Sequence, residues 1–396
     1  MRYNFDKVID RSGTSAEKVE GLKHIWGRTD LIPLWVADMD FATAPFVTDA
    51  IRKRCENEVL GYTGKPDSYY NAIINWVKQR YDLVVTKEMI NFVPGIVPGI
   101  GMAMNCFTQK GDKVMIQPPV YHPFAWVTTR NERTLVTNPL KWENGMYRMD
   151  LDTFREQIKG CKLFILCNPH NPGGVVWTEA ELRAIADICY DEKVLVFSDE
   201  IHADLTLPPH THRPFATVSE KARMNSVTFM SPSKAFNMPG LSASHALIFN
   251  EDLRKRFRIY MDAGELDMGH VFAFLSVEAA YSHGTEWLDQ CLAYIQGNID
   301  FVDDFLKNHA PKIKAIRPEA SYLVWLDCRE LKLSQKDLNE FFVDKAHLAL
   351  NDGEMFGKEG IGFMRLNVAS PRCIIEKAMK QLARSEERRV GKECRS

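Results

Sequence analysis

The sequence predicts an α/β protein with a mostly parallel central sheet, helices on both faces of that sheet, and a smaller α+β domain. Short apolar runs begin near residues 113, 162, 193, 226 and 244, and longer helical patterns separate them. These runs are continuously apolar, without the alternation of a half-exposed strand. Such runs are typical of strands buried on both faces of a parallel sheet.

The stretch TEAELRAIADICYDEK, between two of these runs, predicts a crossover helix. Thr178 and Glu181 have the spacing of a capping box at its start. Leu182 and Ile185 then fall on one helical face. Repetition of strand, helix and strand over residues 46–284 predicts a doubly wound domain, whose site lies at the carboxyl ends of the strands.

After about residue 285 the pattern changes to a long helix, strand-like apolar stretches and further helices. We predict a smaller domain formed by residues 285–383 together with residues 1–45, although no Gly- or Pro-rich linker marks the boundary. Residues 384–396, RSEERRVGKECRS, break from the amphipathic pattern before them and resemble a translated sequencing adapter. We expect this tail to be non-native and leave it out of the fold prediction.

Composition excludes several classes of protein. The 396 residues are 45% hydrophobic and 26% charged, as in ordinary globular proteins, and the net charge of -2 offers no basic surface for nucleic acid. No apolar run approaches the length of a membrane span, and the first residues lack the apolar core of a signal peptide. Nine cysteines without a CxxC pair indicate reduced thiols and no metal site. We expect a cytoplasmic protein that binds neither nucleic acid nor membrane.

Polar side chains follow three successive predicted strands. Asn168 and Asn171 follow one strand, Asp199 and His202 the next, and Lys234 the third. Each has an ordinary explanation when taken alone, as a turn former, a helix cap, a core histidine or a solvated loop lysine. Because parallel strands share a direction, however, their carboxyl ends converge on one crevice. The order of these residues therefore favours a functional site.

This set of side chains suits pyridoxal 5′-phosphate (PLP) chemistry. A lysine amine bonds to the cofactor aldehyde, and a carboxylate beside the pyridine nitrogen keeps that nitrogen protonated. Lys234 and Asp199 fit these two roles. The Asn171 amide and the His202 ring are candidates to contact the phenolic oxygen. Tyr121, just past another strand end, is a candidate to stack on the ring, although a lone tyrosine more often packs in a core.

The cofactor phosphate requires amide and hydroxyl donors. The stretch NFVPGIVPGIGMAM predicts a glycine-containing turn into a helix, where the first amides and the helix dipole favour an anion. Ser231 and Ser233 could add hydroxyl groups beside Lys234. A glycine loop by itself remains a weak signal.

Several of these motifs resemble those of a known family. NPHNPGG, SDEIHADL and SPSKAFNMPGL are similar to motifs of the fold-type I PLP enzymes in the aminotransferase class I/II superfamily. LWVADMDFATAP, VPGIVPGI and PPVYHPF narrow the resemblance to the MalY/PatB-type carbon-sulfur β-lyases, over residues 3–383. The resemblance implies the PLP-dependent transferase-like fold of type I and a homodimer with shared active sites.

The resemblance also implies a role for each matching residue. Tyr62 would reach the phosphate of the neighbouring subunit, and Arg365 would clamp the carboxylate of an amino-acid substrate, a bidentate task that lysine does poorly. The implied catalytic residues are Lys234, Tyr121 and Asp199. The implied cofactor contacts are Lys234, Asp199, His202, Asn168, Asn171, Tyr121, Ile96, Val97, Ser231, Ser233 and Tyr62. The implied substrate contacts are Arg365, Asn171 and Ala37.

Two positions depart from the wider aminotransferase pattern. Ser242 stands where many aminotransferases place a phosphate-binding arginine, and His202 stands where many carry tyrosine. We favour β-elimination of cystathionine or related L-cysteine S-conjugates, which releases a thiol, pyruvate and ammonia, and LWVADMDF is the feature that favours it. An aminotransferase acting on an amino acid and a 2-oxo acid stays open, because the same lysine serves as acid and base in both reactions. A regulatory protein-binding role is the non-enzymatic alternative.

Overall fold

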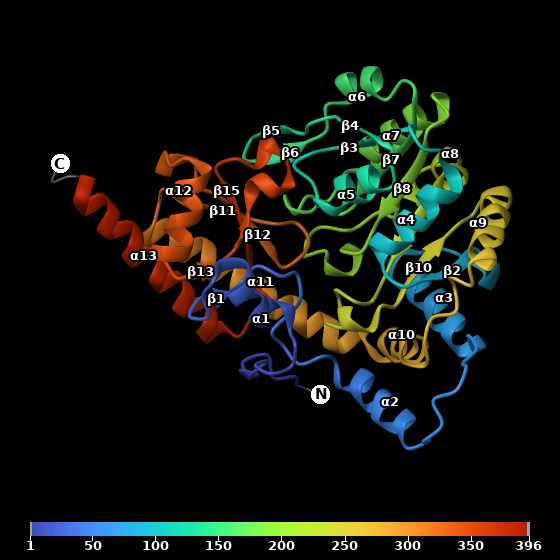
Figure 1. Cartoon of the computed structure of the whole chain (residues 1–396), viewed down its shortest axis with the longest axis horizontal. Helices are drawn as coiled ribbons and strands as arrows, with labels where there is room; N and C mark the ends of the chain where they lie inside the picture. Colours follow the sequence, from blue (N-terminus) through green and yellow to red (C-terminus); the bar gives the residue numbers. More distant parts are fainter. Residues whose placement is uncertain (1, 394–396) are drawn as a thin grey trace.

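A seven-stranded sheet forms the centre of the larger part of the molecule (Figure 1). The computed structural model describes residues 2–393, with side chains up to residue 389. The strand order is β2-β10-β9-β8-β7-β3-β4, and among these described strands β10 alone runs antiparallel to its neighbours. The five apolar runs are all strands of this sheet, so the mostly parallel sheet is confirmed. The strands are β2 (Ile90–Val93), β3 (Lys113–Ile116), β4 (Thr134–Thr137), β7 (Cys161–Cys167), β8 (Leu195–Asp199), β9 (Ser226–Met230) and β10 (Ser244–Leu247).

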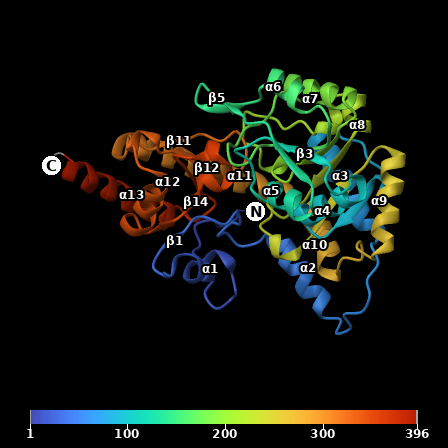
Figure 2. The same ribbon diagram turned by 45° about the horizontal axis from the view of Figure 1, so that its top comes forward.

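Helices cover both faces of the sheet, as predicted. On one face, Ile100 and Phe257 pack with Phe229 of the sheet. On the other, Leu182 packs with Phe164 in a separate buried cluster. Figure 2 shows α7 and α8 on one side of the sheet and α4 on the other. The covering helices are α4 (Ile96–Phe107), α5 (Pro123–Arg130) and α9 (Glu251–Ala263) on the first face, and α6 (Leu151–Gln157), α7 (Glu179–Asp191) and α8 (Glu220–Met224) on the second.

The capping box at the start of α7 forms as predicted. The hydroxyl oxygen of Thr178 accepts from the Glu181 amide at 3.2 Å, and the Glu181 carboxylate accepts from the Thr178 amide at 2.8 Å. These two bonds satisfy amide groups that the first turn of a helix leaves without carbonyl partners. Local sequence therefore determines where this crossover helix begins.

The C-terminal part is built on a four-stranded antiparallel sheet. Its order is β11-β12-β15-β14, beside the long helix α11 (Thr285–His309). Near the N-terminus, β1 pairs in parallel with β13, and Figure 1 shows the blue N-terminal segment beside this orange and red part. This pairing supports grouping residues 1–45 with residues 285–383, and the boundaries stay a prediction. The strands are β1 (Ile32–Pro33), β11 (Lys314–Ile316), β12 (Leu323–Asp327), β13 (Leu348–Ala349), β14 (Asn351–Asp352) and β15 (Phe363–Asn367).

The remaining elements lie around these two sheets. A short hairpin, β5 with β6, forms a two-stranded sheet of its own. Helices α3 and α10 contribute Trp76 and Phe274 to the largest buried cluster of the molecule. The elements are α1 (Glu17–Trp26), α2 (Pro45–Cys55), α3 (Asp67–Tyr81), β5 (Lys141–Glu143), β6 (Met146–Arg148), α10 (Val271–His283), α12 (Gln335–Glu340) and α13 (Arg372–Glu393).

The last helix, α13, continues past residue 383, where the sequence pattern changes. Ser385 is buried, and its hydroxyl donates to the carbonyl of Lys345 at 2.8 Å. The first residues of the expected non-native tail therefore pack on the C-terminal part, and the origin of the tail stays a prediction. Cys394 lies outside the described residues.

Two searches of the described range bear on function. Within residues 2–393, none of the helices has the length and hydropathy needed to cross a bilayer. In the same range, histidine, cysteine and acidic side chains do not gather into a group that could hold a metal ion. The eight cysteines of this range are free thiols, and five of them are buried.

Candidate active site

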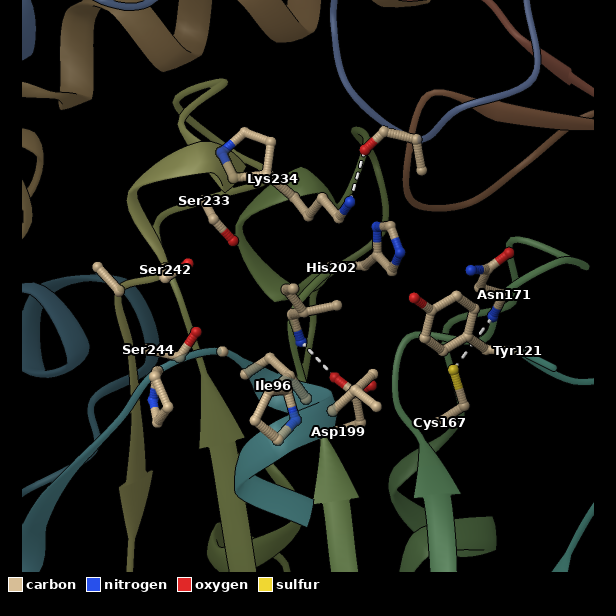
Figure 3. Close-up of a pocket in the computed structure, with 18 residues that line it drawn as sticks. Ile96, Tyr121, Cys167, Asn171, Asp199, His202, Ser233, Lys234, Ser242 and Ser244 are labelled. Carbon is tan, nitrogen blue, oxygen red and sulfur yellow. Dashed lines mark hydrogen bonds between the residues drawn. The ribbon is translucent and has the colours of Figure 1, made fainter. Parts of the chain in front are cut away.

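A cavity of about 200 Å³ lies at the carboxyl ends of the parallel strands (Figure 3). Its wall is made by the loops that follow β2, β3, β7, β8 and β9, together with the segment after β1. The structure thus brings together residues that are far apart in sequence. The predicted site residues that line this cavity are Ala37, Ile96, Val97, Tyr121, Asn171, Asp199, His202, Ser233 and Lys234. The role of each toward a cofactor or substrate stays a prediction.

Lys234 extends into the cavity from the loop after β9. Its amine donates to the carbonyl oxygen of Ala37 at 2.6 Å, as the dashed line in Figure 3 marks. Desolvation of the charged ammonium lowers the pKa of Lys234 to about 8, although the nearby Asp38 carboxylate opposes part of that shift. A substantial fraction of the amine is therefore neutral, and so nucleophilic, near physiological pH.

Asp199 ends β8 and lies opposite Cys167 of β7. Its carboxylate accepts a hydrogen bond from the Ile201 amide at 3.1 Å. Burial raises the pKa of Asp199 to about 7, and the Ile201 hydrogen bond and the Lys234 charge oppose this shift only in part. A cation placed directly against this carboxylate would favour its ionised form. A protonated pyridine nitrogen is such a cation.

The start of α4 provides amide donors for an anion. Gly95 adopts φ 130°, a conformation that favours glycine, and the helix begins at the next residue. The amides of Ile96 and Val97 lie in the first turn, which has no intrahelical carbonyl to accept from them. Pro98 has no N–H, and the Gly99 amide already donates to the Gly95 carbonyl at 2.9 Å. Ile96 and Val97, which carry the two remaining amides, line the cavity, and the positive end of the helix dipole at this position favours an anion such as phosphate.

The two predicted serines have different positions. Ser233 lines the cavity, whereas Ser231 does not. The Ser231 hydroxyl donates to the Ala243 carbonyl at 2.8 Å and lies 2.8 Å from the Ser233 hydroxyl. Ser231 therefore supports the loop behind Ser233. Two further serines, Ser242 and Ser244, also line the cavity.

Arg365, on β15, lies beside the cavity and is buried. Its guanidinium donates to Asn171 at 3.0 Å, to Asn351 at 2.5 Å and to the Trp35 carbonyl at 3.1 Å. It also lies 4.9 Å from the centre of the Phe356 ring. Burial lowers the pKa of Arg365 to about 10, so the group stays charged at neutral pH. A fixed, charged fork of this kind is suited to a carboxylate.

His202 and Tyr121 present uncharged rings to the cavity. Burial and the charges of Lys234 and Arg365 lower the pKa of His202 to about 3, so its imidazole is neutral. Its Nδ1 has no hydrogen-bond partner among the described residues. Burial and the Asp199 charge raise the pKa of Tyr121 to about 12, so its phenol keeps its proton. Both rings can donate or accept a hydrogen bond without adding charge.

Two predicted contacts lie away from the cavity. Asn168 is buried, but its side-chain amide donates to the Arg213 carbonyl at 3.1 Å and the residue does not line the wall. Its position supports the turn that carries Asn171. Tyr62 is 98% exposed and lies on the segment between α2 and α3. It does not line the cavity of its own chain.

Sequence analysis did not single out Cys167, whose sulfur lines the cavity and accepts from the Asn171 amide at 3.3 Å. Figure 3 shows this sulfur close to the Tyr121 ring. Burial and the Asp199 charge raise the pKa of the thiol, which keeps it protonated. A cysteine at the end of an apolar run has no sequence signal that separates it from core packing.

The residues present fit PLP. The cavity combines a desolvated lysine amine, a buried carboxylate whose pKa is raised, and the residues of two helix-terminal amides with a serine hydroxyl for a phosphate. These are the three groups that the aldehyde, the ring nitrogen and the phosphate of this cofactor require.

Lys234 is expected to titrate near pH 8 in the folded protein, because its ammonium form is poorly solvated in the cavity. Competitive labelling with trace acetic anhydride, quantified by peptide mass spectrometry on protein stripped of PLP, measures this midpoint. In urea-unfolded protein the same lysine should return to about 10.4. A midpoint near 10.4 in the folded protein as well would contradict this description of the site.

Comparisons with known proteins place this chain in a family. A family model described as aminotransferase class I and II matches residues 29–382. Cystathionine beta-lyase PatB of Bacillus subtilis (strain 168) is 38% identical over 381 residues, which cover 96% of this chain and 98% of PatB. Protein MalY of Escherichia coli (strain K12) is 31% identical over 384 residues, with the same coverage.

A solved structure agrees with this assignment. Cystalysin from Treponema denticola, which contains a PLP cofactor, matches with a TM-score of 0.94 at 34% identity, over 98% of this chain and 99% of cystalysin. The expected transferase-like fold of type I and the resemblance to the MalY/PatB type are both confirmed. The chain belongs to the aminotransferase class I and II family.

Proposed function

We propose that this chain is a PLP-dependent carbon-sulfur β-lyase that acts on cystathionine or related L-cysteine S-conjugates. The observation that carries the proposal is one cavity that joins the Lys234 amine, the Asp199 carboxylate and the amide-rich start of α4, with Arg365 beside it. The name of the relative PatB, cystathionine beta-lyase, at 38% identity over nearly the whole chain, supports the substrate class. We expect the enzyme to work in the cytoplasm.

Different cavity residues would contact different parts of the cofactor. The amides of Ile96 and Val97, with Ser233, would hold the phosphate, while Asp199 would face the ring nitrogen and His202 the phenolic oxygen. When bound, PLP supplies an electron sink for the pair left behind when a Cα–H bond breaks. The buried Asp199 carboxylate strengthens that property because its negative charge keeps the ring nitrogen protonated.

The substrate is held by its carboxylate. Arg365 and Asn171 offer the bidentate donors and the amide that this group requires. The neutral Lys234 amine would then take the Cα proton. The Cβ–S bond breaks next, a carbon-carbon double bond forms between Cα and Cβ, and the thiolate leaves and takes up a proton. Water then hydrolyses the resulting enamine to pyruvate and ammonia.

The exposed position of Tyr62 supports a homodimer. Its ring is 98% exposed and cannot serve the cavity of its own chain. Val59 and Leu60, beside it, are 72% and 59% exposed. An exposed apolar segment of this kind is typical of an interaction surface. We propose that a second copy of the chain covers it and that each subunit lends Tyr62 to the phosphate site of the other.

The first test supplies L-cystathionine, without any 2-oxo acid, to the PLP-loaded protein and assays pyruvate and free thiol together. Both products should form catalytically and in equal amounts. Lys234→Ala should reduce turnover by at least about 10²-fold, since a positioned acid-base group contributes that much or more. A protein that formed neither product, yet turned over an amino acid once a 2-oxo acid was supplied, would be an aminotransferase.

Arg365→Lys is expected to raise KM for L-cystathionine by about tenfold or more, because a single ammonium replaces a bidentate fork. PLP affinity should change little, since the guanidinium bonds Asn171, Asn351 and the Trp35 carbonyl and none of the residues assigned to the phosphate. Arg329→Lys is the matched control. Arg329 makes a bidentate pair with Asp327 outside the cavity, so its KM should stay at the wild-type value. Loss of PLP with an unchanged KM in Arg365→Lys would contradict the assigned role.

A further inference from the structure

The segment of residues 35–41, here called the strap, borders the cavity through Ala37, and side chains from other elements donate hydrogen bonds to its carbonyl groups. Arg365 donates to the Trp35 carbonyl at 3.1 Å, and Asn367, also on β15, donates to the carbonyls of Val36 and Asp38 at 2.7 and 2.6 Å. From the opposite side, Asn237 donates to the carbonyls of Met39 and Phe41 at 3.0 and 2.8 Å. The strap is therefore held from two sides.

The strap is also anchored through its own side chains. Lys18 is fully buried and lies 2.8 Å from the Asp40 carboxylate, and its amine donates to the Asp38 carbonyl at 3.3 Å. Arg11 pairs with Asp38 at 2.6 Å and with Asp40 at 3.1 Å. A buried lysine is costly unless it is paired, so this arrangement strongly favours one position of the strap.

The carbonyl of Ala37, at the centre of the strap, accepts two hydrogen bonds. One comes from the Lys234 amine at 2.6 Å and the other from the Tyr322 hydroxyl at 2.9 Å. Tyr322 is fully buried, directly before β12. The residue before it, Ser321, has φ 81°, which is costly for any residue except glycine, and its amide donates to the Leu205 carbonyl at 2.9 Å. Tyr322 is thus held in place by a backbone conformation at Ser321 that is unfavourable in free energy.

We propose that Tyr322 is a positioning residue for proton transfer, which acts by holding the Ala37 carbonyl that in turn holds the free Lys234 amine. A neutral amine has two N–H groups and one lone pair, so an N–H donated to Ala37 leaves the lone pair to point elsewhere in the cavity. Tyr322 fixes that direction without touching the substrate. The inference rests on the proposed role of Lys234 as the base.

Positioning of this kind matters because proton transfer requires geometry first. A displacement of about 1 Å in a reacting group can cost about 10²-fold in rate. The strap also joins the base to the substrate anchor, because Arg365 donates to Trp35, two residues before Ala37. The lysine and the carboxylate-binding arginine are therefore placed relative to the same short segment.

The test measures exchange of the Cα proton of L-alanine with deuterium from D2O, by NMR, on PLP-loaded protein. Alanine has no leaving group at Cβ, so exchange reports proton transfer alone. Tyr322→Phe, which removes only a hydroxyl, should slow exchange about tenfold at unchanged PLP content. Tyr69→Phe is the matched control, because Tyr69 is equally buried and its hydroxyl has no partner among the described residues. Equal rates for the two variants would falsify the proposal.

A second readout needs no cofactor. Hydrogen-deuterium exchange mass spectrometry of the strap peptide, in protein stripped of PLP, should show faster exchange at the Met39 amide in Tyr322→Phe and no change in Tyr69→Phe. Unchanged strap exchange in Tyr322→Phe would count against the proposal. If Tyr322→Phe binds no PLP, Asn367→Asp, which removes two donors to the strap, should slow alanine exchange in its place, and normal exchange in that variant would overturn the idea.

The outcomes separate this inference from the proposed function. Wild-type protein that exchanges the alanine proton and forms no pyruvate from cystathionine would refute the lyase and leave the role of Tyr322 intact. Loss of exchange in Lys234→Ala with normal exchange in Tyr322→Phe would refute the role of Tyr322 and leave the lyase intact. If the wild type showed no exchange, Lys234 would not be the base, and the proposed role of Tyr322 would be refuted as well.

Discussion

Desolvation of Lys234 and Asp199 in one cavity is the interaction on which the rest of the site depends. It lowers the pKa of the lysine to about 8 and raises the pKa of the carboxylate to about 7, so each group is shifted toward its neutral form. Both pKa shifts suit a cofactor that carries an aldehyde and a basic ring nitrogen. The aldehyde requires a neutral amine, and the protonated ring nitrogen would place a cation beside the carboxylate. Perturbed pKa values that arise from burial in a cavity are typical of functional sites.

The fold explains how this burial is achieved. Six parallel strands end at the same edge of the sheet, the loops after five of them line the cavity there, and the start of α4 adds amides at that edge. The C-terminal part contributes Arg365, on β15, which bonds Asn171 of the cavity wall and the Trp35 carbonyl of the strap, and the strap places the Ala37 carbonyl against Lys234. The residues proposed for chemistry and those proposed for substrate recognition thus come from different parts of the chain and meet at the strap.

The sequence alone predicts the features of the fold and the site that depend on a few neighbouring residues. Continuous apolar runs identify buried strands, and Thr178 with Glu181 identifies a helix start, because both signals lie within a few residues. The reversed direction of β10 has no such signal, since an apolar run carries no direction. The contact between Tyr322 and Ala37 joins residues 285 positions apart, and the side chain of Asn168 turns away from the cavity to bond Arg213. Such features depend on tertiary packing, which no short pattern encodes.

The position at which the cofactor is attached to the chain is the decisive measurement for the role of Lys234. Borohydride reduction of the PLP-loaded protein, followed by peptide mass spectrometry, fixes the cofactor to the amine that holds it. This account predicts a single pyridoxyl group, on Lys234, and its disappearance in Lys234→Ala. A pyridoxyl group on another lysine, with Lys234 unmodified, would contradict the account.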